Sequence, residues 1–269
     1  MKIVRFASGG EIFLGQMVSP GRARPIQGDL FGDWVVEERE VAIERLLAPI
    51  VPADILCIGV NYRKHAEETG SAIPQTPMLF IKASTTLNDP HGIIVAPFNS
   101  TMVDFEAELC VVIGKAARHV SRENALEHVF GYTCANDVSA RDWQRDKSLS
   151  GGQFARGKSF DTFCPLGPWI VTRDEIPNPN ALSIRCVLNG QVVQDSNTCD
   201  MIYDVPALIA SLSSTLTLRP GTVILTGTPS GVGMGRTPPL WLKSGDSVVV
   251  EIGSIGRLEN TVSAELAPK

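Results

Sequence analysis

The 269 residues include 24 basic and 29 acidic side chains, a formal net charge of −5, and no long block of Lys or Arg, so nucleic acid and anionic membranes are poor candidate partners. No window of about eighteen uninterrupted apolar residues occurs, which excludes an ordinary membrane-spanning helix and predicts a soluble protein. The hydrophobic content of 43% is enough to fill the core of one large domain with a small addition.

The first 50 residues predict a small β-rich module. Apolar runs at 2–7 and 11–17 alternate with charged residues and Gly, which is typical of a hairpin and unlike the continuous apolar stretch of a signal peptide. The Pro-containing stretch 49–54 separates this module from the rest. We therefore expect an N-terminal module at 1–50 and a main domain at 51–269.

From Ile55 onward, short β-rich runs dominate, and they are not spaced as a βαβ series. Asn189-Gly190 lies between two alternating runs and predicts a hairpin. Helices are predicted at 121–131, with Ser121 as N-cap, and at 204–216, where apolar residues recur on one face. The predicted fold class is α+β with predominantly β content.

Two glutamates are spaced for the same face of one strand. In 102–112 (MVDFEAELCVV), period-two alternation places Asp104, Glu106 and Glu108 opposite a set of apolar residues. Neighbouring like charges raise each other's pKa unless water or a cation neutralises them. Water would suffice on an exposed strand, but the apolar continuation favours a strand that enters the core.

A third carboxylate, Asp137, follows an apolar segment, and Ser139 and Asp142 after it are spaced as a helix capping box. A turn or cap role would explain Asp137 by itself. With Glu106 and Glu108 it offers three hard oxygen donors, a set suited to Mg²⁺ or Mn²⁺, with Ca²⁺ as a further candidate. Zinc would more often recruit His or Cys.

The six cysteines show no CxxC pairing, and several lie inside apolar runs. Buried reduced thiols are therefore favoured over a zinc site or a disulfide framework. A reducing compartment, the cytoplasm, is the expected location.

Further polar residues are candidates for catalysis or substrate binding. His65 and Glu68 share a face if 63–70 is helical, so the carboxylate can orient the imidazole as a base, with an ordinary solvent-exposed helix as the alternative. Thr228, in the Gly-rich loop TGTPSGVGMG, can offer its hydroxyl to a substrate carboxylate, whereas a nucleotide loop is disfavoured because no helix follows. Arg141 and Gln144 are candidate substrate contacts.

Six motifs, in this order, resemble the fumarylacetoacetate hydrolase family, especially its members with short N-terminal strands. They are GVNYRKHAEE, DFEAELCVVIG, NDVSARDWQ, GKSFDTFCPLGP, VLNGQVVQDSNT and VILTGTPSGVG, within roughly Asp54 to Val262. ARDWQ and KSFDTFCPLGP are most similar to the acylpyruvate hydrolase-like subgroup that includes the animal domain-containing protein 2, associated with oxaloacetate tautomerisation.

The resemblance implies a mixed β-roll with few helices for the catalytic domain, and a homodimer. It also implies that Glu106, Glu108 and Asp137 hold the metal, with Lys158 close to the metal-bound oxygens; by itself Lys158 would equally suit a surface salt bridge. His65 and Glu68 would lie on a segment that closes over substrate.

The chemistry expected of such a site begins with a small 2-oxo acid, which chelates a hard cation through its carboxylate and keto oxygens and so forms a stabilised enolate. We expect a divalent-metal-dependent hydrolase that cleaves a carbon-carbon bond in acylpyruvate-type 2,4-dioxo acids. Oxaloacetate tautomerase or decarboxylase, and hydroxy-dienoate isomerase, are alternatives that share this enolate. A catalytically silent metal- or metabolite-binding relative is disfavoured because the candidate residues are all present together.

Overall fold

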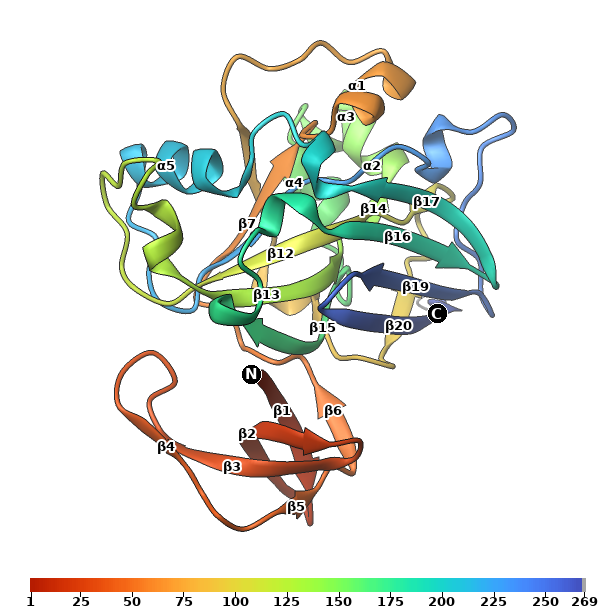
Figure 1. Cartoon of the computed structure of the whole chain (residues 1–269). Helices are drawn as coiled ribbons and strands as arrows, with labels where there is room; N and C mark the ends of the chain where they lie inside the picture. Colours follow the sequence, from red (N-terminus) through yellow and green to blue (C-terminus); the bar gives the residue numbers. More distant parts are fainter. Residues whose placement is uncertain (268–269) are drawn as a thin grey trace.

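The computed structural model describes residues 1–267 (Figure 1). The N-terminal strands are β1 (Lys2–Ser8), β2 (Glu11–Ser19), β3 (Arg22–Gly28), β4 (Trp34–Val36), β5 (Val41–Ala42) and β6 (Arg45–Leu47). The next set is β7 (Ile55–Gly59), β8 (Met78–Ile81), β9 (Leu87–Asn88), β12 (Ala107–Ile113), β13 (Val129–Asn136), β15 (Cys164–Thr172) and β18 (Val223–Leu225). The others are β10 (Ile93–Ala96), β11 (Val103–Asp104), β14 (Ser139–Ala140), β16 (Ser183–Leu188), β17 (Gln191–Asn197), β19 (Ser247–Ile252) and β20 (Gly256–Ala264).

Helical elements are short. The α-helices are α1 (Arg63–Thr69), α2 (Arg141–Arg145), α3 (Lys147–Ser150), α4 (Phe154–Lys158) and α5 (Val205–Thr215). The 3₁₀ turns are η1 (Ser84–Thr86), η2 (Ala125–His128), η3 (Arg173–Glu175), η4 (Pro179–Ala181), η5 (Thr198–Asp200) and η6 (Gly233–Gly235).

A 13-stranded sheet forms the frame, in the order β4-β3-β2-β1-β15-β13-β12-β18-β7-β8, with β5, β6 and β9 paired beside it. A five-stranded sheet has the order β10-β20-β19-β16-β17, and β11 pairs with β14. The predicted α+β class with predominantly β content is confirmed.

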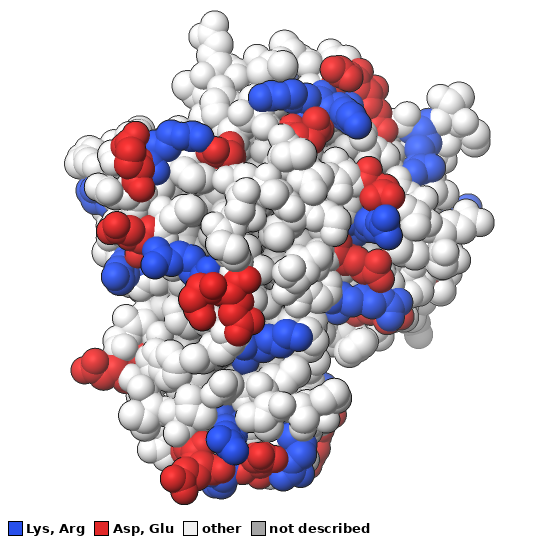
Figure 2. All heavy atoms as spheres, in the orientation of Figure 1, with Lys and Arg blue, Asp and Glu red and all other residues white. Residues whose placement is uncertain are grey.

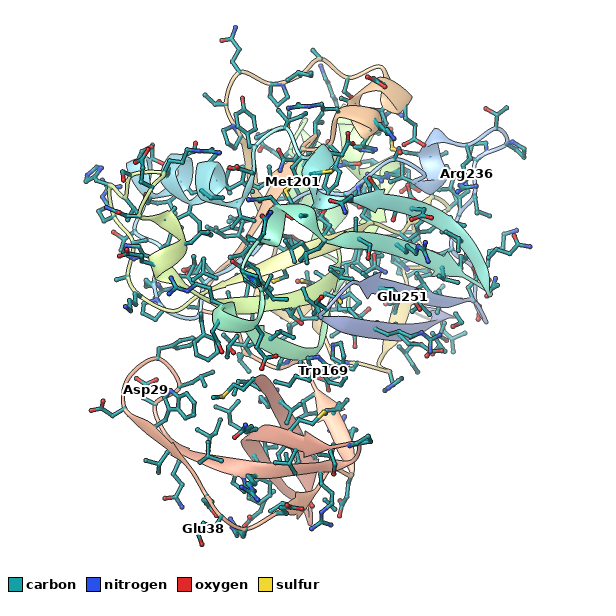
Figure 3. All side chains as sticks on the ribbon, viewed as in Figure 1. Asp29, Glu38, Trp169, Met201, Arg236 and Glu251 are labelled. Carbon is teal, nitrogen blue, oxygen red and sulfur yellow. The ribbon has the colours of Figure 1, made fainter. Side chains whose placement is uncertain are left out.

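The N-terminal strands lie at the end of the molecule opposite α1 and α3 (Figure 1). The predicted first hairpin is present as β1 and β2, and β1 extends the large sheet by pairing with β15. Trp169, labelled in Figure 3, lies at this junction, where the Lys2 ammonium is 4.5 Å from its ring centroid. The N-terminal strands are therefore joined to the rest through a shared sheet.

Strand β12 is buried on both faces. Leu109 and Val111 pack in a cluster with Ile184 of the five-stranded sheet, while Cys110 packs on the other side with Ile170. The sequence pattern thus correctly indicated a strand in the core. It did not reveal that the run is broken, since residues 105–106 lie between β11 and β12.

Helix predictions succeeded at one place and failed at another. Helix α5 forms where the apolar spacing predicted a helix. It follows the N-cap Asp204, whose side chain accepts a hydrogen bond from the Ala207 amide. The helix predicted at 121–131 is wrong: only η2 forms, and β13 begins at Val129. The capping box is also wrong, because Ser139 donates to the Asp137 carbonyl and α2 has no side-chain cap.

The remaining sequence expectations concern the hairpin, the thiols and the surface. Asn189 and Gly190, both with positive φ, join β16 to β17. All six cysteines are free and five are buried. On the face in Figure 2, basic and acidic side chains are interspersed. Within residues 1–267, none of the helices has the length and apolar character needed to cross a membrane.

Candidate active site

Three carboxylates converge because antiparallel pairing brings the start of β12 beside the end of β13. The register places Ala107 opposite Asn136, and the Asp137 amide donates to the Glu106 carbonyl at 2.9 Å. One ligand oxygen from each of Glu106, Glu108 and Asp137 lies within 4.8 Å of the others, and all three side chains are buried. The predicted triad therefore comes together.

Two buried lysines neutralise part of this charge. The Lys158 ammonium, at the end of α4, is 2.6 Å from Glu106 Oε2 and 2.6 Å from Asp137 Oδ2. Lys82, directly after β8, donates to Asp137 Oδ1 at 2.5 Å and to the Val138 carbonyl. Burial disfavours the charged form of Lys158, but Asp137 and Glu106 outweigh it and raise the lysine pKa.

Arg141 connects the triad to a fourth buried carboxylate. Its guanidinium donates to Asp104 Oδ2 at 2.9 Å, to Glu106 Oε1 at 2.6 Å and to Gln144 Oε1 at 2.9 Å. Asp104 also accepts hydrogen bonds from the backbone amides of Gly233 and Met234. Arg141 is thus fixed between the triad and the η6 turn.

Glu106 and Glu108 have opposite electrostatic surroundings. Burial opposes ionisation of Glu106, but Lys158 and Arg141 outweigh it and hold its pKa well below the ordinary value. Burial raises the pKa of Glu108, and Asp137 and Glu106 raise it further. The Glu108 carboxylate accepts from the Gly227 amide at 2.7 Å and has no ion-pair partner among residues 1–267.

The donor set fits a divalent cation. Three hard carboxylate oxygens converge in a buried position, and one of the carboxylates lacks a positive partner within the described chain. An ion held by Glu106, Glu108 and Asp137 would offset that charge. The nearby Cys57 thiol is a poor competing ligand, because burial raises its pKa well above the ordinary value.

His65 and Glu68 form a pair on the predicted helix, which is α1. The distance between His65 Nδ1 and Glu68 Oε2 is 3.3 Å, and Glu68 Oε1 accepts from the Gly231 amide at 2.8 Å. Both side chains are mostly buried, at 10% and 19% exposure, which contradicts the alternative of an ordinary exposed helix. The glutamate therefore fixes the imidazole in one orientation.

The Thr228 hydroxyl is already engaged by the protein. It donates to the Ala107 carbonyl at 3.1 Å and accepts from Gln194 Nε2 at 2.9 Å. A substrate contact through its donor hydrogen would require rotation of the hydroxyl.

These groups surround one cavity of about 330 Å³. His65, Arg141, Gln144, Lys158 and Thr228 line it together with the two glutamates, and apolar side chains complete the walls. The residues that sequence reasoning proposed for catalysis and substrate binding thus border the same space, apart from Glu68, which supports His65 from behind.

Two contributors were missed from the sequence. Lys82 directly follows the apolar run at 78–81, and a lysine at the end of an apolar strand was the available signal. Asp104 was grouped with the glutamates by alternation, but its carboxylate binds Arg141 and η6 and is not part of the triad.

Comparison with known proteins identifies the family of this chain. The family model "Fumarylacetoacetate (FAA) hydrolase C-terminal" matches residues 54–263, and the model "Rv2993c-like, N-terminal" matches residues 1–49. A fumarylacetoacetate hydrolase domain-containing protein 2 homolog from Dictyostelium discoideum is 48% identical, over 84% of this chain and 77% of that protein.

Two further relatives are enzymes by name. The mitochondrial oxaloacetate tautomerase fahd2 of Xenopus laevis is 50% identical, over 81% of this chain and 68% of that protein. The crystal structure of 2-hydroxyhepta-2,4-diene-1,7-dioate isomerase from Mycobacterium marinum is 38% identical, with a TM-score of 0.84 over 99% of this chain and 100% of that one. The protein is accordingly an enzyme of the hydrolase, isomerase and tautomerase group, and it belongs to the fumarylacetoacetate hydrolase family, among the domain-containing protein 2 relatives.

Proposed function

We propose that the protein is a divalent-metal-dependent tautomerase that interconverts the enol and keto forms of a small 2-oxo acid of the oxaloacetate type. The observation that carries the proposal is the buried carboxylate triad, of which Glu106 and Glu108 border the same cavity as Lys158, Arg141 and the oriented histidine. The oxaloacetate tautomerase relatives support this reaction over the others in the family.

The cavity floor is suited to the oxygen end of a 2-oxo acid. When bound by Glu106, Glu108 and Asp137, Mg²⁺ or Mn²⁺ supplies Lewis-acid polarisation of the 2-oxo group. Lys158 presents its ammonium to the charge that develops on the 2-oxo oxygen, a contact of a type commonly worth roughly 3 to 4 kcal/mol. Gln144 Oε1 is occupied by Arg141, so its amide hydrogens remain for the substrate carboxylate.

His65 is positioned to move the proton. If Nδ1–H donates to Glu68, the lone pair of Nε2 is available as a base. In the enol-to-keto direction the enol hydroxyl loses a proton and C3 gains one, and His65 holds the proton during transfer. No water is consumed, and every atom of the substrate is retained.

Carbon-carbon hydrolysis of acylpyruvates is the second candidate. The same His65–Glu68 pair could direct a water molecule at the distal carbonyl, and the family model carries a hydrolase name. Decarboxylation of oxaloacetate and hydroxy-dienoate isomerisation use the same 2-oxo end, and the Mycobacterium marinum relative is named for the latter.

Product analysis separates these reactions. Purified protein with Mn²⁺ is mixed with enol-oxaloacetate or with acetylpyruvate, and ultraviolet loss of the enol and pyruvate release are followed in parallel. We expect rapid loss of enol-oxaloacetate without pyruvate. Pyruvate from acetylpyruvate would make the protein a hydrolase, and no turnover of any 2-oxo acid would contradict every candidate above.

We also propose a homodimer and keep the predicted cytoplasmic location as a proposal. Strand β8 ends the large sheet and exposes Met78, Leu79 and Ile81, an apolar edge suited to a second copy of this chain. Light scattering on the purified protein tests the dimer, and a monomeric mass would contradict it.

A further inference from the structure

The mouth of the active-site cavity carries two positive side chains that the fold leaves without partners. Arg145 ends α2 and Lys147 begins α3; both are exposed, and both line the cavity. Within residues 1–267, neither side chain forms a salt bridge or a hydrogen bond. The buried cations of the same cavity differ, because Lys158 and Arg141 are each paired with two carboxylates.

The intervening acidic residue, Asp146, forms no ion pair with either of these cations within the described residues. Asp146 Oδ1 accepts from the Ser148 amide at 2.8 Å and from the Ser148 hydroxyl at 2.7 Å, so it caps α3. The carboxylate of Asp146 is thereby directed to the first turn of α3.

The cavity therefore has charged side chains both on its floor and at its rim. Its buried floor holds the glutamates and Lys158, its exposed rim holds Arg145 and Lys147, and apolar side chains such as Phe80 and Phe154 contribute to the walls. A ligand complementary to both ends has a 2-oxo acid at one end and a second anionic group at the other. Arginine offers a planar fork to a carboxylate, and lysine adds a compact charge.

We propose that Arg145 and Lys147 form a subsite for the distal carboxylate, which makes the enzyme selective for 2-oxo dicarboxylates over 2-oxo monocarboxylates. The inference rests on the proposed function, because it takes the 2-oxo end to lie on the cavity floor.

The test compares two substrates that differ by one charge, enol-oxaloacetate and its C4 methyl monoester. In the double variant Arg145→Gln/Lys147→Gln, kcat/KM for the diacid falls about 10- to 100-fold, as expected for loss of hydrogen bonds to a charged group. Turnover of the monoester stays close to the wild-type value.

Arg156→Gln is the matched control. Arg156 is an exposed arginine on the neighbouring helix α4, stacks on Trp143 with 5.0 Å to the ring centroid, and does not line the cavity. This variant removes one positive charge near the site and is expected to leave the turnover of both substrates unchanged. An equal loss on diacid and monoester in the double variant, or an equal diacid loss in the control, would overturn the subsite.

Failure of the proposed function gives a different result. If the wild type converts neither substrate, calorimetric titration of the Mn²⁺-loaded protein with each compound still tests the subsite. Selective loss of diacid affinity in the double variant supports it, and equal affinity of wild type and variant for the diacid overturns it.

Discussion

Glu106 and Glu108 stand two residues apart and are both buried, yet only Glu106 has positive partners among the described residues. Lys158 and Arg141 flank Glu106, whereas Glu108 has one backbone amide. A buried carboxylate without a partner destabilises the folded state while it is ionised. Glu108 is therefore the residue through which the proposed metal would affect stability most directly.

Glu108→Gln is predicted to stabilise the metal-free protein at neutral and alkaline pH. Burial, followed by Asp137 and Glu106, raises the pKa of Glu108 in the folded state. Below the pKa that Glu108 has in the unfolded chain, the residue is protonated in both states and costs no stability. As pH rises from there through the raised pKa of the folded state, stability of the wild type is lost. Gln does not ionise, so the variant avoids this loss. Calorimetric melting in EDTA measures the difference, which should vanish at acidic pH.

Mn²⁺ should make the wild type more stable than the Glu108→Gln variant, the reverse of their order in EDTA. Wild type gains about RT ln(1 + [L]/Kd) from a ligand that binds the folded state, and the variant, which lacks one ligand charge, gains less. Equal Mn²⁺-induced shifts in melting temperature for wild type and variant would remove Glu108 from the metal site.

Asp104→Asn is predicted to cost about 1–3 kcal/mol of unfolding free energy, because it weakens four hydrogen bonds to the buried Asp104 carboxylate, including the one from Arg141. Catalytic efficiency should fall with it, since Arg141 loses one of its two carboxylate partners. Denaturant titration measures the stability. Asp195→Asn, in an ion pair with both side chains more than half exposed, is the control and should change stability by less than about 1 kcal/mol.

Among the elements of the fold, the turn η6 lies against α1 beside the cavity, which its residue Met234 helps to line. Gly235 lies so close to Glu68 that an added Cβ would be 2.5 Å from the glutamate Cδ. Arg236, labelled in Figure 3, donates to the Gly231 and Val193 carbonyls and holds the same loop. The loop therefore sets the position of Glu68 against His65.

Gly235→Ala is predicted to lower kcat by about 10- to 100-fold, the usual effect of losing a group that orients a catalytic residue. Glu68 is a flexible side chain, so it moves away and the fold survives. Mn²⁺ affinity should stay unchanged. In a Glu68→Ala background the same substitution should have no further effect on kcat; additive losses would show that Gly235 acts on something other than Glu68.

Local patterns predicted the elements whose signals agree with their surroundings. Helix α5 has an N-cap residue and apolar residues that recur on one face, and this face is buried. The Asn189-Gly190 pair forms a hairpin turn that only a few dipeptides favour. The helix predicted at 121–131 failed because Val129 onward pairs with β12, and burial in a central sheet outweighs a weak helical pattern.

The sequence predicted which residues belong to the candidate site, but not how their side chains are arranged in space. The spacing of Glu106 and Glu108 is visible along the chain, but Lys82 reaches Asp137 from 55 residues away, through strand pairings that no short motif encodes. The break at residues 105–106 was likewise hidden, because alternation continues through it.

In the molecule as a whole, the large sheet brings together the groups of the candidate active site. Carboxylates at the start of β12 and directly after β13 meet cations from α2, from α4 and from the residue after β8, and α1 adds the histidine. The N-terminal strands contribute no side chain to the cavity lining.

In the proposed reaction, enol–keto conversion depends on a divalent cation that the carboxylate triad binds. The most direct measurement is a Mn²⁺ titration of EDTA-treated protein, with ion binding by electron paramagnetic resonance and loss of enol-oxaloacetate followed together. We expect one tightly bound ion per chain and a ketonisation rate that rises in proportion to the occupancy of this site, without release of pyruvate. Ketonisation at full rate in the stripped protein, or tight binding with no gain in rate, would contradict this expectation.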